Sequence, residues 1–134
     1  MSQANVTFVQ SMYAAFSRGD IETIIQACTP DIEWHSGGRK EDYPAFGLRK
    51  GAAEVRDFFR TVAGQLEFSE FLPQEFYCDR DKVFVLGQYT AAMRKNGDRV
   101  SSDWCHVFTF RGGKVEKFRE FTDTAAFKTA YQGG

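Results

Sequence analysis

Two glycine-containing pairs divide the C-terminal half of the chain into short extended segments. Asn96-Gly97 is a strong signal for a two-residue hairpin turn, because both residues tolerate positive φ, and Gly112-Gly113 is a second turn signal. The segments around these pairs are rich in β-branched and aromatic residues. We predict strands near 67–78, 82–95, 99–110 and 114–122. This half of the chain is therefore expected to form antiparallel hairpins.

The N-terminal half has helical periodicity instead. A first helix is indicated by apolar residues at i, i+3, i+4 and i+7, which are Val9, Met12, Tyr13 and Phe16. It should end at Gly19, and Asp20 should cap a short second helix that Pro30 terminates. The stripe of this second helix is Ile21, Ile24, Ile25 and Cys28. The inner face of a third helix is Val55, Phe58, Phe59, Val62 and Leu66.

The order of these elements sets the fold class. Asp31–Ser36 reads as a short strand, 37–51 as a loop, and Asp123 as the cap of a last helix over 124–131. Helices followed by a run of strands are typical of an α+β fold. We predict one domain over 1–134, in which a curved antiparallel sheet packs one face against the three N-terminal helices.

Composition excludes several classes of partner. The net charge is −1 and the basic residues are scattered, so no surface for nucleic acid is expected. We see no signal peptide and no apolar run near the roughly 20 residues of a membrane span. The three cysteines are odd in number and have no paired spacing, which favours a reducing, cytoplasmic location.

Metal and cofactor signatures are also missing from the sequence. The two histidines fall on different predicted strands, and neither Cys-x-x-Cys nor His-x-x-x-His spacing occurs. No glycine-rich phosphate loop and no flavin or nicotinamide motif is present. We therefore expect no metal and no cofactor.

Register arithmetic predicts which side chains share a face of the sheet. A two-residue turn at 96–97 places Trp104 opposite Tyr89 and His106 opposite Gly87. A three-residue loop at 111–113 then places Glu120 diagonally from His106, about 7–8 Å away. A two-residue turn at 112–113 would instead turn Glu120 outward. The predicted inner face is Gly87, Tyr89, Ala91, Ser102, Trp104, His106, Phe108, Phe118 and Glu120.

This inner face has the character of a small-molecule pocket. Aromatic side chains form its walls, Gly87 and Ala91 leave space, and a few polar groups point inward. Trp34 shares a face with Ile32 and should belong to the wall. The opposite face mixes polar and apolar residues, so we expect it to pack against a second copy of the chain in a homodimer.

Three motifs resemble the nuclear-transport-factor-2-like superfamily, in particular its SnoaL-like and ketosteroid-isomerase-related branch. They are FSRGD at 16–20, PDIEW at 30–34 and GKVEKFREFTD at 113–123. The resemblance implies a cone-shaped α+β barrel with a hydrophobic pocket, commonly dimeric through its sheets. Enzymes of the superfamily include steroid isomerases, polyketide cyclases, dehydratases and epoxide hydrolases.

The resemblance also bears on individual residues. In the epoxide hydrolases an acid stands where this chain has Glu120, next to an aromatic residue at the position of Phe118. The arginine and second acid of those enzymes would fall at Gly87 and Tyr89, so epoxide hydrolysis is not expected. The tyrosine with which the isomerases bind the substrate oxygen falls at Met12 or Tyr13.

Two functional hypotheses follow. In the first, Glu120, its pKa raised by the apolar surroundings, moves a proton of an apolar, carbonyl-bearing or polyketide-like molecule, while His106 and Tyr89 bind its oxygen. The ligand would contact Tyr13, Trp34, Gly87, Ser102, Trp104, Phe108 and Phe118. In the second, the chain is a non-catalytic dimeric module that binds a ligand or protein. An open cavity with Glu120 close to His106 favours the enzyme, and a cavity plugged by aromatic rings favours the module.

Overall fold

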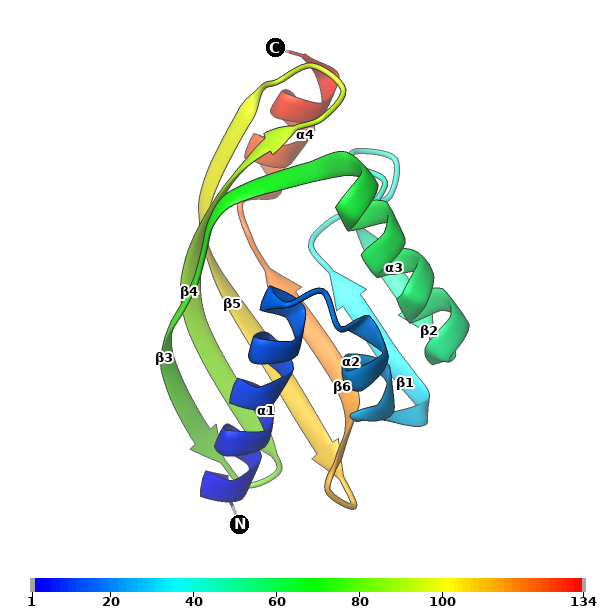
Figure 1. Ribbon diagram of the computed structural model, residues 1–134, viewed down its shortest axis with the longest axis vertical. Helices are drawn as coiled ribbons and strands as arrows, with labels where there is room; N and C mark the ends of the chain where they lie inside the picture. The colour runs from blue at the N-terminus through cyan, green and yellow to red at the C-terminus, as the bar shows by residue number, and fades with distance from the viewer. Residues whose placement is uncertain (1, 134) are drawn as a thin grey trace.

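The structure, a computed structural model, describes residues 2–133 as four helices and six strands (Figure 1). In chain order these are α1 (Ser2–Ser17), α2 (Ile21–Gln26), β1 (Cys28–Ser36), β2 (Gly47–Lys50), α3 (Gly51–Gln65), β3 (Leu66–Asp79), β4 (Lys82–Met93), β5 (Arg99–Arg111), β6 (Lys114–Phe121) and α4 (Thr124–Gln132). The α+β class predicted from the sequence is confirmed.

The predicted helix boundaries agree with the structure where a capping residue sets them. Gly19 has φ +74° after α1, Asp20 accepts a hydrogen bond from the Thr23 amide at 3.2 Å, and Asp123 accepts one from Ala126 at 3.0 Å. The prediction that Pro30 terminates α2 is wrong. That helix ends at Gln26, and both Cys28 and Pro30 belong to β1.

The strands form one curved, unclosed sheet in the order β2-β1-β6-β5-β4-β3. Figure 1 shows α1, α2 and α3 on the same side of this sheet. The sheet is mixed, because β1 runs parallel to β6 while the other neighbouring strands are antiparallel. The parallel pairing places Trp34 beside Phe118 and Ser36 beside Glu120.

The hairpin of β4 and β5 differs from the predicted two-residue turn. Met93 and Asp98 flank a four-residue loop, and the Met93 amide donates to the Asp98 carbonyl at 2.7 Å. Trp104 therefore lies opposite Gly87, and Tyr89 opposite Ser102. The register differs by two residues, so the predicted inner residues still share one face.

The hairpin of β5 and β6 is closed by the two-residue turn Gly112-Gly113, not by the predicted three-residue loop. An irregularity after the turn leaves Glu116 as an extra residue, since Phe110 pairs with Val115 and Thr109 with Lys117. This bulge restores the parity of β6. Glu120 consequently lies on the inner face, directly opposite His106.

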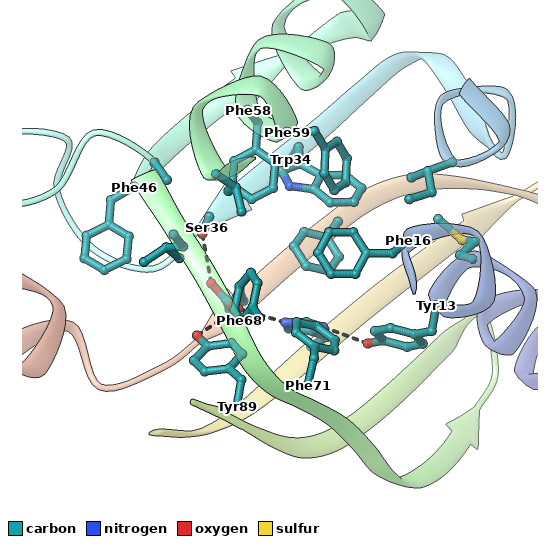
Figure 2. A pocket seen from close by; sticks show the side chains of 18 of the residues that line it. Tyr13, Phe16, Trp34, Ser36, Phe46, Phe58, Phe59, Phe68, Phe71 and Tyr89 are labelled. Carbon is teal, nitrogen blue, oxygen red and sulfur yellow. Dashed lines mark hydrogen bonds and ion pairs between the residues drawn. The ribbon is translucent and has the colours of Figure 1, made fainter. Parts of the chain in front are cut away.

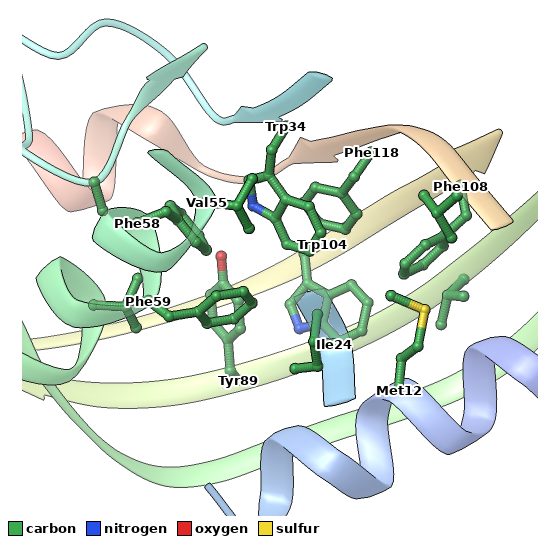
Figure 3. Close-up of a cluster of buried hydrophobic side chains, with 14 of the residues drawn as sticks. Met12, Ile24, Trp34, Val55, Phe58, Phe59, Tyr89, Trp104, Phe108 and Phe118 are labelled. Atoms are coloured by element: carbon green, nitrogen blue, oxygen red, sulfur yellow. The ribbon is translucent and has the colours of Figure 1, made fainter. Parts of the chain in front are cut away.

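An aromatic core fills the space between the sheet and the helices. Trp34 stacks on Phe118 with ring centroids 4.0 Å apart, and Phe58 and Phe59 of α3 pack against the same indole. Figure 3 shows these rings together with Met12, Ile24 and Phe108. The core thus holds the inner face of β1 and β6 rigidly against α1 and α3.

Candidate functional site

A cavity of about 90 Å³ lies inside the fold, between the inner face of the sheet and the helices. Most of its lining is aromatic or aliphatic, including Phe16, Phe59, Phe71, Phe108 and Phe118. Its polar lining residues are Tyr13, Ser36, Tyr43, Tyr89, His106 and Glu120. Figure 2 shows several of these polar side chains linked by hydrogen bonds at one side of the hydrophobic lining.

A chain of hydrogen bonds runs from α1 to β6 through His106. Tyr13 Oη lies 2.7 Å from His106 Nδ1, and His106 Nε2 lies 2.9 Å from Glu120 Oε2 (Figure 2). The imidazole also stacks on the Trp104 indole at 3.9 Å. Because both ring nitrogens and one ring face are engaged, the orientation of His106 is fixed.

The Glu120 carboxylate receives hydrogen bonds from three residues. Besides His106, Ser36 Oγ donates to Oε1 at 2.9 Å, and the Tyr89 hydroxyl lies 3.2 Å from Oε2. Burial by itself raises the pKa of Glu120, but the hydrogen bonds and the charge of His106 outweigh it and hold the pKa below its ordinary value. The raised pKa expected for a carboxylate in an apolar cavity is therefore wrong, and Glu120 is ionised at neutral pH.

The two tyrosines at this end of the cavity remain protonated. Burial, followed by the charge of Glu120, raises the pKa of both Tyr13 and Tyr89 well above the ordinary value. The Tyr89 hydroxyl also lies 2.7 Å from Thr122 Oγ1. Both phenols are thus hydrogen-bonding groups that support His106 and Glu120.

Three of the predicted ligand-binding residues do not line the cavity. They are Gly87, Ser102 and Trp104. The open space expected at Gly87 does not exist, because a Cβ there would overlap the Trp104 ring and come 2.5 Å from the Leu72 carbonyl oxygen. Trp104 lies behind His106 and supports it. The Ser102 hydroxyl accepts the Asp123 amide at 3.0 Å, next to the start of α4.

The other predicted residues do line the cavity, and two of its polar lining residues were missed. Tyr13, Trp34, Phe108 and Phe118 are part of its wall together with Tyr89, His106 and Glu120. Ser36 was missed although it shares strand parity with Ile32 and Trp34, which was a usable signal. Tyr43 was missed because it lies in the 37–46 loop, where no periodicity orients side chains.

Metal binding and membrane insertion receive no support from the described residues. Within residues 2–133, no three His, Cys, Asp or Glu side chains are grouped so that they could hold a metal ion. No helix in that range has the length and apolar character needed to cross a bilayer.

His35, the second histidine, is half-buried, and burial together with the charge of Arg119 lowers its pKa.

A model of the SnoaL-like domain matches residues 9–118, which include most of the sheet and most of the residues that line the cavity. The chain belongs to the SnoaL-like domain family. A search of curated proteins finds no match.

Several solved structures have a similar fold over nearly the whole length of this chain. An NTF2-like protein from Burkholderia xenovorans is 30% identical, with a TM-score of 0.88 and 97% of each chain covered. TerC, which was crystallised with polyporic acid, is 28% identical, with a TM-score of 0.81 and coverage of 97% of this chain and 99% of TerC. An epoxide hydrolase from Mycobacterium tuberculosis is 20% identical, with a TM-score of 0.73 and coverage of 98% and 92%, a likeness of fold alone.

Proposed function

We propose that this SnoaL-like protein is an acid–base enzyme acting on a small, largely apolar molecule that carries a carbonyl group. The observation that carries the proposal is the ionised Glu120 carboxylate in an aromatic cavity, 2.9 Å from the ring nitrogen of His106. A fixed carboxylate beside a hydrophobic binding space is suited to take a proton from a bound carbon acid.

The reaction begins with an ionised Glu120. In this state His106 Nε2–H donates to Glu120, while Nδ1 of the same ring is hydrogen-bonded to the Tyr13 hydroxyl. Glu120 takes a proton from the carbon next to the carbonyl, the C–H electron pair forms an enolate, and the carbonyl oxygen becomes negative. Return of the proton to another carbon gives an isomer, and loss of a neighbouring hydroxyl group as water gives a dehydrated product.

The structure changes the roles expected for His106 and Tyr89. Both nitrogens of His106 are already hydrogen-bonded, and the Tyr89 hydroxyl contacts Thr122 and Glu120. Neither residue has a free donor for a substrate oxygen. We therefore assign both to positioning the carboxylate, which is a structural requirement for an effective base.

A non-catalytic ligand-binding protein is the second candidate function. It is favoured by the number of hydrogen bonds to Glu120, which is typical of a satisfied buried carboxylate, and by the small cavity. An apolar cavity of about 150 Å³ binds benzene, whereas this cavity measures about 90 Å³. A ligand of the size of benzene or larger therefore requires the lining to move.

Hydrogen–deuterium exchange separates the two candidates. An acid–base enzyme accelerates exchange at the α-carbon of small cyclic ketones and enones in D₂O, which proton NMR measures, while a binding protein does not. Glu120→Gln should abolish the acceleration. Glu116→Gln is the matched control, because Glu116 lies on the same strand and pairs with Arg111 at 3.1 Å outside the cavity.

We also propose a homodimer through the outer face of the sheet. Leu86, Cys105 and Phe121 form one cross-strand row on this face, and Leu86 and Phe121 are 39% and 48% exposed. Exposed apolar side chains in a contiguous row are a common feature of subunit interfaces.

The three cysteines are free, which supports a reducing compartment such as the cytoplasm.

A further inference from the structure

Two hydrogen-bond donors in the cavity wall have no partner. Tyr43 is 1% exposed and Trp34 is 4% exposed, and both line the cavity. Neither the Tyr43 hydroxyl nor Trp34 Nε1–H finds a hydrogen-bond partner among residues 2–133. Buried polar groups are nearly always paired, so two unpaired donors in one cavity wall indicate a group that is bound there in the working protein.

Neighbouring side chains fix the position of Tyr43. The Arg49 side chain, 6% exposed, donates to the carbonyl oxygens of Pro44 and Ala45 at 3.0 Å each. The Tyr43 ring packs against Phe46 and Phe127 with centroids 5.2 and 5.3 Å away. The loop is thereby held in one conformation, and the phenol is held in the wall without using its own hydroxyl.

The charge of Glu120 affects the pKa of the Tyr43 hydroxyl. Burial first, and then the negative charge of Glu120, raises the pKa of Tyr43 above its ordinary value. The phenol therefore stays protonated and is a donor at neutral pH. Tyr43 and Glu120 also line the same cavity, so one bound molecule can contact both the donor and the base.

We propose that Tyr43 and Trp34 receive the acceptor oxygen of the ligand, so that the cavity selects a carbonyl-bearing ring, of the ketone or enone class, over a hydrocarbon of the same shape. The inference rests on the proposed function, since it supplies the donors that an enolate oxygen needs when His106 and Tyr89 are engaged elsewhere. An indole N–H and a phenol O–H can donate but carry no competing positive charge. Both donors can therefore hydrogen-bond a carbonyl oxygen that is neutral in the substrate and becomes negatively charged in the enolate.

Binding of two matched probes tests the proposal. Cyclohex-2-enone labelled with ¹³C at its carbonyl and unlabelled cyclohexene, of similar shape, are titrated into the protein and followed by NMR. We expect the enone to bind at least tenfold more tightly and its carbonyl resonance to move downfield on binding. Tyr43→Phe should reduce the affinity for the enone about tenfold and diminish the shift, leaving the affinity for cyclohexene unchanged.

Two further variants keep the result interpretable. Trp34→Phe keeps an aromatic ring but removes the N–H, and it should diminish the carbonyl shift even if Tyr43→Phe fails to fold. Tyr131→Phe is the control, because this ring packs against Tyr43 at 5.5 Å and does not line the cavity. Tyr43→Phe should also melt at the same or a higher temperature without ligand, because it removes an unpaired buried hydroxyl.

Several outcomes would overturn the inference. These are equal affinity for enone and cyclohexene, no binding of the enone at millimolar concentration, or an unchanged carbonyl shift in both Tyr43→Phe and Trp34→Phe, as expected if the two donors hold only water. Failure of the proposed function looks different. In that case the wild type binds the enone with the expected shift but does not accelerate exchange at its α-carbon.

Discussion

His106 and Glu120 lie directly opposite each other on β5 and β6, with Nε2 2.9 Å from Oε2. The pairing depends on the bulge at Glu116, which compensates for the two-residue turn before it. It keeps the acid in the cavity and gives it an imidazole as a hydrogen-bond partner.

Stability should depend on pH through Glu120. Its folded pKa lies below the ordinary value of 4.5, so its contribution to stability is complete above pH 4.5 and is lost as the pH falls through the folded pKa. We predict that the wild type exceeds Glu120→Gln in free energy of unfolding at pH 7 and that the difference shrinks towards pH 3. Urea denaturation at several pH values measures it. A difference that does not change with pH would contradict the assignment.

Gly87→Ala should destabilise the protein and disturb His106. The added methyl group overlaps the Trp104 ring, which stacks on the imidazole. We expect the free energy of unfolding to fall by about 1–3 kcal/mol, as for other overpacked cores, and the His106 ring resonances to shift in NMR spectra.

Gly64→Ala is the matched control for this substitution. Gly64 lies in α3, and a Cβ added there would have no atom within 4 Å, so alanine should stabilise the helix by about 0.5–1 kcal/mol. Equal effects of the two substitutions would show that the close packing of Gly87 on Trp104 is not important.

Arg49→Met should loosen the loop that carries Tyr43. It removes a buried cation and leaves the carbonyl oxygens of Pro44 and Ala45 without their donor. We predict a loss of about 2–3 kcal/mol in the free energy of unfolding and faster amide exchange over residues 43–47. Arg39→Met, in the same loop but with a 70% exposed side chain, should change neither quantity appreciably.

Leu86→Lys should dissociate the proposed dimer. It places a charge at one end of the exposed row formed with Cys105 and Phe121. Sedimentation velocity should show a dimer for the wild type and for Gln10→Lys, an exposed position on α1, and a monomer for Leu86→Lys. A monomeric wild type at micromolar concentration would rule out the interface.

Much of the fold could be predicted because local signals determine it. Asp20, Asp123 and Gly19 define helix ends through their own capping or backbone geometry. The inner face was correct although both predicted turn lengths were wrong, because the net register shift was two residues in each hairpin, with the bulge at Glu116 adding the second residue in β6. Side chains alternate with a period of two, so such an error preserves the face.

The parts that could not be predicted depend on contacts between distant segments. The parallel pairing of β1 with β6, which brings Ser36 to Glu120, has no turn signal because more than 80 residues separate the two. The position of Tyr43 depends on Arg49 and on the packing of a loop, neither of which follows a periodic pattern. The lowered pKa of Glu120 likewise results from donors on three different strands.

Exchange of α-protons for deuterium tests the central claim, that Glu120 acts as a base, most directly. With cyclohex-2-enone and related cyclic ketones in D₂O, we predict that the wild type and Glu116→Gln accelerate exchange above the buffer rate. Glu120→Gln should lower the protein-dependent rate by about 10²–10⁴-fold, the usual contribution of a positioned base. Equal protein-dependent rates for the wild type and Glu120→Gln would contradict the account.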